Sequence, residues 1–108
     1  MIKKEEMPLC DVATKVQLVG SKWKVLIIRE LISGPKRTSE LKRSLIGISQ
    51  KVLTESLNSM IEDGLVTKLD LKKVPPHVEY RLTHLGESFL PVIEAMRQWG
   101  SYYKSQLT

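Results

Sequence analysis

The stretch GISQKVLTESLNSMIEDGLV, residues 47–66, carries both a helix start and a helix stop, and it decides the fold. Ser49 is a good N-cap because its hydroxyl can accept a backbone hydrogen bond, and Gly64 tolerates the left-handed conformation in which helices often end. Apolar residues between them recur at intervals of three and four, which places them on one inward face: Leu53, Leu57, Met60 and Ile61. The first turn is instead polar and cationic, so its purpose needs an explanation.

The outward face of this helix presents residue types that can contact DNA. Lys51, Glu55 and Asn58 point away from the apolar face, and Gln50 and Thr54 flank the exposed amino-terminal end. Gln pairs bidentately with adenine, Lys contacts guanine or phosphate, and a free helix N-terminus attracts a phosphate oxygen. Any helix also shows such residues to water, and this helix alone favours that plainer interpretation.

The segments before this stretch predict three more helices. Residues 1–7 are charged and aperiodic, which predicts a flexible arm, and residues 9–20 predict a short first helix. The segment 21–34 predicts the central core helix, with Ser21 as N-cap and a stop at Gly34 and Pro35. Its apolar stripe consists of Trp23, Leu26, Ile27, Leu31 and Ile32. A brief helix capped by Thr38 follows, with Glu40 in its first turn.

The segments after it predict a hairpin and a last helix. Residues 65–71 and 77–83 alternate between apolar and polar side chains, as paired strands do, and Pro75 and Pro76 belong at the hairpin tip because proline cannot donate ladder hydrogen bonds. Residues 84–107 predict one long helix, kinked at Pro91. Its apolar stripe, which a short chain cannot cover internally, predicts a dimer interface with the first helix, made of Val12, Val16, Phe89, Ile93, Met96, Trp99 and Tyr103.

The composition limits the chain to one domain. With 108 residues, of which 42% are hydrophobic, it can enclose one modest core. Its 17 Lys and Arg against 12 Asp and Glu give a net charge of +5, which suits an anionic partner such as nucleic acid. The apolar runs are far shorter than the roughly 20 residues of a membrane span, and residues 1–6 are too charged for a signal peptide. We therefore expect a cytoplasmic protein without a membrane partner.

The order of these elements predicts a mainly α fold with a small β-hairpin wing: a winged helix-turn-helix domain over residues 1–108, extended by dimerisation helices at both ends. The short helix, the turn and a Lys-Lys-Val-Pro-Pro tip all have a place in one DNA-binding geometry, and this coincidence favours DNA contact over the plainer interpretation. The predicted DNA-binding residues are Arg37, Lys42, Arg43, Ser49, Gln50, Lys51, Thr54, Glu55, Asn58, Lys72, Lys73 and His77. Among them, Gln50, Lys51 and Thr54 are expected to read bases.

Two long motifs carry a resemblance to a known family. GSKWKVLIIRELISGPKRTSELKRSLIGISQKVLTESLNSMIEDGLV (residues 20–66) and VPPHVEYRLTHLGESFLPVIEAMRQWG (residues 74–100) resemble the HxlR family of bacterial transcriptional regulators, from Cys10 to Tyr103. The resemblance implies a homodimer built on the first and last helices, a recognition helix over residues 49–63 and a wing over residues 65–83. We therefore expect a regulator, more often a repressor, that binds an inverted-repeat operator.

Other functions have less support from the sequence. The two histidines, His77 and His84, form no acid, base and nucleophile set, so we expect no enzyme, and one Cys with two distant His predicts neither a metal site nor a cofactor. A winged helix that docks on another protein without reading DNA is the main alternative. RNA binding is disfavoured because the candidate reader is a helix rather than an aromatic-studded sheet.

Cys10 is the only thiol, and two roles are open for it. Free cysteine is among the most buried residue types, so a small apolar residue in the dimer interface is one interpretation. Some HxlR-type regulators carry a cysteine at the matching position that senses oxidants or electrophiles, which is the other. No effector is indicated by the sequence.

Overall fold

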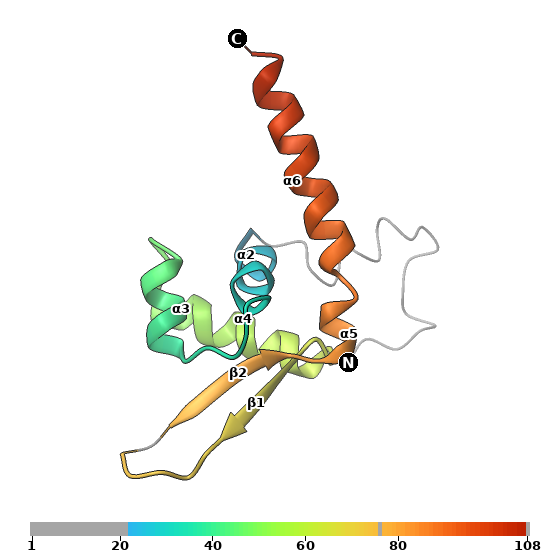
Figure 1. Cartoon of the computed structure of the whole chain (residues 1–108). Coiled ribbons are helices and arrows are strands. Elements are labelled where there is room, and N and C mark those ends of the chain that lie inside the picture. The colour runs from blue at the N-terminus through green and yellow to red at the C-terminus, as the bar shows by residue number, and fades with distance from the viewer. Residues whose placement is uncertain (1–21, 76, 108) are drawn as a thin grey trace.

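The computed structural model describes residues 22–75 and 77–107. It contains helices α2 (Lys22–Leu31), α3 (Thr38–Ser44), α4 (Gln50–Glu62), α5 (His84–Glu87) and α6 (Leu90–Ser105), and strands β1 (Val66–Asp70) and β2 (Val78–Leu82). The predicted arm and first helix, with Cys10, Val12, Val16 and the Ser21 cap, lie outside the described residues. The mainly α architecture with one hairpin confirms the predicted fold class (Figure 1).

The core lies where α2, α3, α4 and the hairpin meet. Ile27 and Ile28 of α2 are fully buried, and they pack with buried residues of the other elements: Leu41, Leu45, Leu53, Leu57, Met60, Val66 and Leu82. Trp23 and Leu26 pack partly against this core, as predicted. The predicted stripe on α2 is wrong at its end, because Ile32 is 44% exposed. Since α2 ends at Leu31, Ile32 lies in the following turn rather than on the helix face.

The turns around α3 and α4 follow local backbone chemistry. Gly47 and Gly64 adopt φ of 94° and 80°, which glycine accepts without strain, and they mark the predicted turn and helix stop. Ser49 caps α4 as predicted, and its hydroxyl accepts a hydrogen bond from the Val52 N–H (3.1 Å). The predicted cap of α3 is off by one residue. Arg37 occupies the N-cap position, and its N–H donates to the Glu40 carboxylate (3.0 Å), so Thr38 is already helical.

The wing is an antiparallel hairpin in which Val66 lies opposite Leu82 and Asp70 opposite Val78. Tyr80 and Leu82 are buried and Arg81 between them is exposed, which confirms the predicted alternation at this end of β2. Elsewhere the alternation is wrong: Val78 and Glu79 are both half-buried, and Leu69 of β1 is 42% exposed, because the hairpin leaves the body toward its tip and neither face is covered there. The loop before α3 covers the other edge of β2, because Lys36 and Tyr80 exchange two backbone hydrogen bonds (2.9 and 2.8 Å). The base of the wing is thereby fixed to the helical body.

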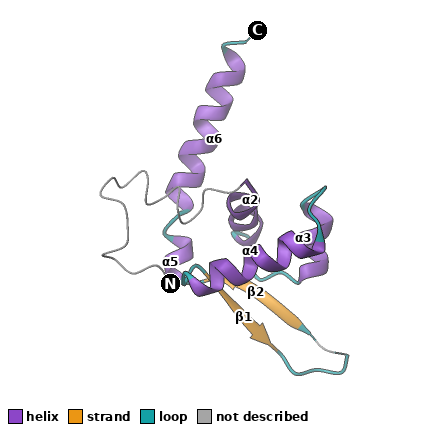
Figure 2. Cartoon of the chain, turned by 180° about the vertical axis from the view of Figure 1, so that it is seen from behind, coloured by secondary structure: helices purple, strands orange, loops and turns teal. Residues whose placement is uncertain are grey.

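The carboxyl-terminal segment is two helices and not the single kinked helix that periodicity predicts. Thr83 caps α5 by accepting from the Gly86 N–H (3.0 Å), and α6 begins at Leu90 with Pro91 in its first turn. A first-turn proline loses no hydrogen bond, since the first N–H groups of a helix have no partner within it. From there α6 extends away from the body (Figures 1 and 2). Of the described helices, none combines the length and apolar character that crossing a membrane requires.

Candidate nucleic-acid interface

The amino-terminal end of α4 combines exposure with fixed orientation. Gln50, Lys51 and Thr54 are all exposed, and the Gln50 side-chain amide donates to the Thr54 hydroxyl (3.2 Å). Two predicted base readers therefore lie against each other at the free end of the helix. Glu55 and Asn58 continue the polar face, while Leu53 and Leu57 on the opposite face are buried. This amphipathic division allows α4 to present polar side chains to a ligand without disturbing the core.

A hydrogen bond that no sequence pattern predicts attaches α4 to α2. The Lys24 ammonium group, on the partly buried side of α2, donates to the Ser59 hydroxyl (2.8 Å). The only hint in the sequence is that Lys24 lies between the apolar residues Trp23 and Val25. This contact helps to hold the rotation of α4 about its axis and hence the direction of its polar face.

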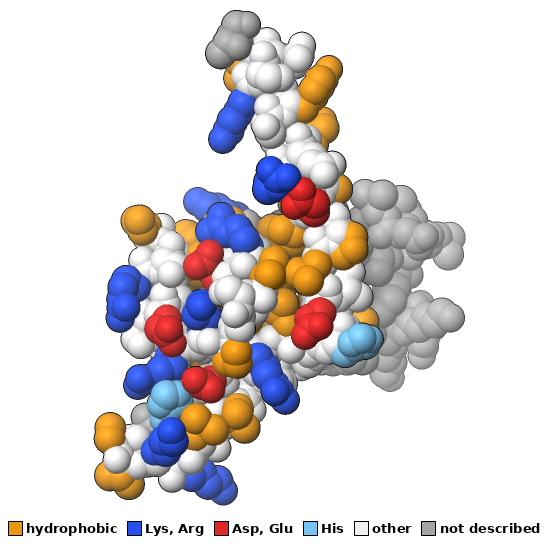
Figure 3. Space-filling view, in the orientation of Figure 1, with side chains coloured by type: hydrophobic (Ala, Val, Ile, Leu, Met, Phe, Trp, Pro, Cys, Tyr) orange, Lys and Arg blue, Asp and Glu red, His pale blue; other side chains and the backbone are white. Residues whose placement is uncertain are grey.

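Three cations lie on or beside α3, which precedes α4 in the helix-turn-helix. Arg37, Lys42 and Arg43 are exposed, and within the described ranges none of them forms an ion pair. Figure 3 shows Lys and Arg side chains over this side of the body and along the wing, with fewer acidic side chains between them. Unpaired cations keep their full attraction for an anionic ligand.

The wing carries two further exposed cations on a hydrogen-bonded turn. Lys72 and Lys73 lie at the tip, where the Lys72 N–H donates to the Asp70 carboxylate (2.9 Å) and the Leu71 N–H to the His77 carbonyl oxygen (2.9 Å). His77, one of the predicted DNA-binding residues, is only partly exposed. Its side chain is 24% exposed, and its Nε2 lies 3.1 Å from the Glu79 carboxylate, so one of its two ring nitrogens already has a partner.

The predicted dimer residues separate into two groups on α6. Phe89 and Ile93 pack partly against the chain's own core. Met96, Trp99 and Tyr103 are 42, 64 and 51% exposed, and the Trp99 and Tyr103 rings stack with centroids 5.4 Å apart. Tyr102 and Leu107, which are not among the predicted interface residues, are also exposed there. The projecting part of α6 thus carries apolar side chains that no described residue covers.

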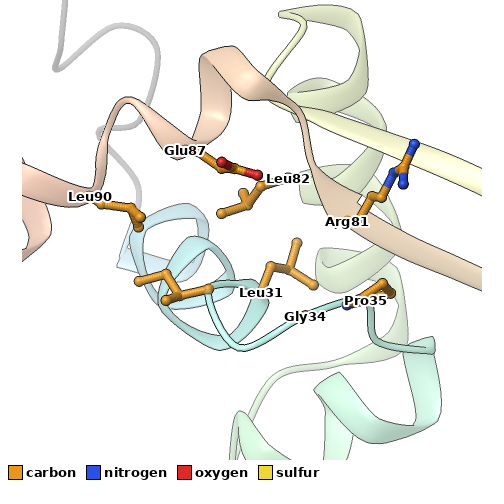
Figure 4. Close-up of a pocket in the computed structure, with 8 residues that line it drawn as sticks. Leu31, Gly34, Pro35, Arg81, Leu82, Glu87 and Leu90 are labelled. Atoms are coloured by element: carbon orange, nitrogen blue, oxygen red, sulfur yellow. The ribbon is translucent and has the colours of Figure 1, made fainter.

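A separate hollow of about 310 Å³ lies where the end of α2 meets β2, α5 and the start of α6 (Figure 4). Leu31, Leu82 and Leu90 line it, with Arg81 and Glu87 among the lining residues. None of its lining residues belongs to α3 or α4, so it is distinct from the candidate interface. The described part of the chain also contains no group of three or more His, Cys, Asp and Glu that could hold a metal ion.

A helix-turn-helix with an exposed polar second helix and a basic β-hairpin beside it defines the winged helix-turn-helix class. Within this class, the chain belongs to the HxlR-like helix-turn-helix family, whose model matches residues 18–108. It is therefore a transcriptional regulator, and its relatives are regulators rather than enzymes.

Known relatives agree with this assignment. The helix-turn-helix transcriptional regulator YkvN of Bacillus subtilis is 44% identical over 97 residues, which cover 90% of this chain and 82% of YkvN. The crystal structure of the regulator ytcD superimposes with a TM-score of 0.86 at 36% identity, covering 90% of this chain and 99% of that one. The redox regulator HypR in its reduced form superimposes with a TM-score of 0.85 at 34% identity, covering 91% of this chain and 97% of HypR.

Proposed function

We propose that this chain is a homodimeric, sequence-specific DNA-binding regulator that acts in the cytoplasm by occupying a promoter, as a repressor of the genes it controls. The observation that carries the proposal is the exposed, hydrogen-bonded Gln50–Thr54 pair at the free end of α4. A helix of this kind can enter the major groove, where a Gln amide matches the donor and acceptor edge of adenine. Lys51 beside it suits guanine or a phosphate.

The other DNA contacts are assigned by charge and position. Arg37, Lys42 and Arg43 beside α3 and the wing pair Lys72 and Lys73 supply phosphate contacts, which fix the register without reading sequence. Ser49, Glu55 and Asn58 border the readers on α4. Because Glu55 is repelled by phosphates, its place is beside a cytosine amino group. His77 has the weakest support, since its ring already lies against Glu79.

The proposed dimer follows from the uncovered apolar face of α6. Met96, Trp99 and Tyr103 pack against the partner protomer and against Val12 and Val16 of the first helix. A twofold axis places the two α4 helices in successive major grooves about 34–36 Å apart, which requires an inverted-repeat operator with that centre spacing.

The test begins with an operator selected from a random duplex pool by the purified full chain. Gln50→Ala should weaken operator binding by about 1–3 kcal/mol and leave random-duplex binding nearly unchanged, because base readout is lost while phosphate contacts remain. Gln98→Ala on α6 is the matched control and should bind as the original chain does. Equal losses on operator and random DNA would contradict base readout by Gln50. A chain that binds no duplex at all would favour the protein-docking alternative.

A redox response is a second candidate, favoured by the structural similarity to HypR, which was solved in oxidised and reduced forms. With Cys10 as the only thiol, a response requires an adduct or a disulfide between the two protomers, formed as an oxidant such as diamide takes up two electrons and two protons. Operator affinity measured with and without diamide, beside a Cys10→Ser control, tests this role. Unchanged affinity in both proteins would mean that Cys10 is structural.

A further inference from the structure

The tip of the wing presents an apolar point to solvent. Val74 is 99% exposed, which makes it the most exposed large apolar side chain in the described part of the protein, and the exposed Pro75 follows it. Figure 3 shows hydrophobic side chains at the outer end of the wing, beside Lys and Arg side chains. Single exposed apolar residues are common on protein surfaces, so exposure alone carries no argument.

Two hydrogen bonds close the base of the tip. The ladder ends at the pair Asp70 and Val78, and beyond it the Asp70 carboxylate accepts the Lys72 N–H (2.9 Å) while Lys72 takes a left-handed φ of 51°. The Leu71 N–H to His77 carbonyl bond (2.9 Å) closes the loop below the tip. The exposed valine therefore lies in a short loop that these hydrogen bonds close at its base.

The charges beside Val74 indicate the kind of surface that the tip fits. Lys72 and Lys73 precede it directly, and the neighbouring Asp70 carboxylate is engaged with backbone. An apolar point beside two cations matches a narrow groove with anionic walls and a floor that can accept an apolar group. The minor groove of duplex DNA, about 6 Å wide and edged by phosphates, has this character.

The wing also extends in a suitable direction. In both ribbon views it projects to the side of the body where α3 and the amino-terminal end of α4 lie (Figures 1 and 2). Five paired residues in each strand carry the tip outward by about 16 Å at the usual rise of a strand. With α4 in the major groove, as in the function proposed above on which this step rests, the tip reaches the adjacent minor groove.

We propose that Val74 packs on the floor of that minor groove and makes the wing select A·T over G·C pairs there. The floor of an A·T pair carries only acceptors, whereas guanine adds an amino group that projects into the groove. An isopropyl group against that amino group would bury its N–H without a partner, which is unfavourable. Val74 is thus a specificity-determining residue that offers no hydrogen bond of its own.

Inosine separates this mechanism from readout in the major groove. An inosine·C pair matches G·C in the major groove but lacks the amino group in the minor groove. Each pair flanking the α4 half-sites of the selected operator is replaced in turn by G·C and by inosine·C, and binding of the full chain is measured. At the wing-contacted pair, we expect G·C to raise the Kd by about 5- to 50-fold and inosine·C to restore it to within about twofold.

Variants then show whether Val74 is responsible. Val74→Ser should reduce the G·C penalty to less than about twofold, and the substitution leaves the fold intact because the side chain touches nothing buried. Ile46→Ser, at an apolar residue 88% exposed in the α3–α4 turn, is the matched control and should keep the full penalty.

Three outcomes would overturn the proposal. If inosine·C weakens binding as much as G·C does, the readout lies in the major groove. If Val74→Ser retains the full G·C penalty while Lys72→Ala loses it, the preference for A·T pairs comes from Lys72, which the negative potential of a narrow minor groove attracts. Either result overturns the inference alone, whereas a chain that binds no duplex removes the proposed function and the inference together.

Discussion

Gly86 occupies a position where α5 passes too close to the chain before β1 for any side chain. A Cβ atom at this residue would meet the Leu65 carbonyl oxygen at 2.1 Å. Gly86→Ala should therefore lower the free energy of unfolding by about 1–3 kcal/mol, as overpacking does, in urea titrations followed by circular dichroism. Gly100 on α6 is the matched control, because a Cβ atom there would have no neighbour within 4 Å. Gly100→Ala should raise the same free energy by about 0.5–1 kcal/mol, and equal effects at both glycines would contradict this account.

Thr83 joins three segments through one hydroxyl. The hydroxyl donates to the Gly64 carbonyl oxygen (2.6 Å) and accepts from the Gly86 N–H (3.0 Å). Thr83→Val keeps the shape and removes both bonds, so the free energy of unfolding should fall by about 1–3 kcal/mol. Thr67→Val, at a partly buried position of β1, should change it by less than about 0.5 kcal/mol. A similar loss in both variants would mean that the hydroxyl of Thr83 is unimportant.

Individual residues show what the sequence could reveal. The Ser49 cap was predictable because its chemistry is local, and the exposure of Gln50 and Lys51 followed from the period of α4. The Lys24–Ser59 bond joins residues 35 positions apart, so no local pattern could predict it. The place of His77 also depended on a contact with Glu79 that strand alternation does not encode.

Among the elements, the wing allows the clearest electrostatic prediction. Lys72 and Lys73 lie on the hydrogen-bonded turn at the end of the wing, away from the body. Each should therefore contact one phosphate and release counterions when the protein binds DNA. The double substitution to alanine should flatten the slope of log affinity against log salt concentration by about two units on random duplex. The pair Lys22→Ala and Lys104→Ala removes the same charge from α2 and α6, and it should change the slope by much less. Equal slopes for both double variants would contradict phosphate contact by the wing.

The elements also show where periodicity misleads. Apolar residues recur at intervals of three and four from Leu85 to Tyr103, which predicted one helix. In the structure, however, α5 ends at Glu87 and a new helix begins at Leu90. The apolar spacing persists because α5 and α6 both have it. The starts of the two helices are instead determined by the Thr83 cap of α5 and by Pro91 in the first turn of α6. Proline was predicted to kink a helix, whereas here it lies in the first turn of one.

For the whole molecule, assembly is the central prediction. We expect a dimer at micromolar concentration in sedimentation velocity, and Trp99→Asp should give a folded monomer, because Trp99 is 64% exposed and a buried charge opposes association. Ile46→Asp places the same charge on another exposed apolar residue, 88% exposed, and should remain a dimer. A monomeric original chain, or an operator footprint without a dyad, would contradict the arrangement.

The projecting part of α6 links folding to protein abundance. Beyond Ile93, residues 94–105 of α6 have little packing against the other described residues, and isolated helices of about 12 residues are marginal in water. In the proposed dimer, the partner supplies that packing, so the last turns become ordered as protomers associate. Promoter occupancy then rises with about the square of the protomer concentration while monomers predominate. A modest change in synthesis of the chain is thereby converted into a sharper change in transcription.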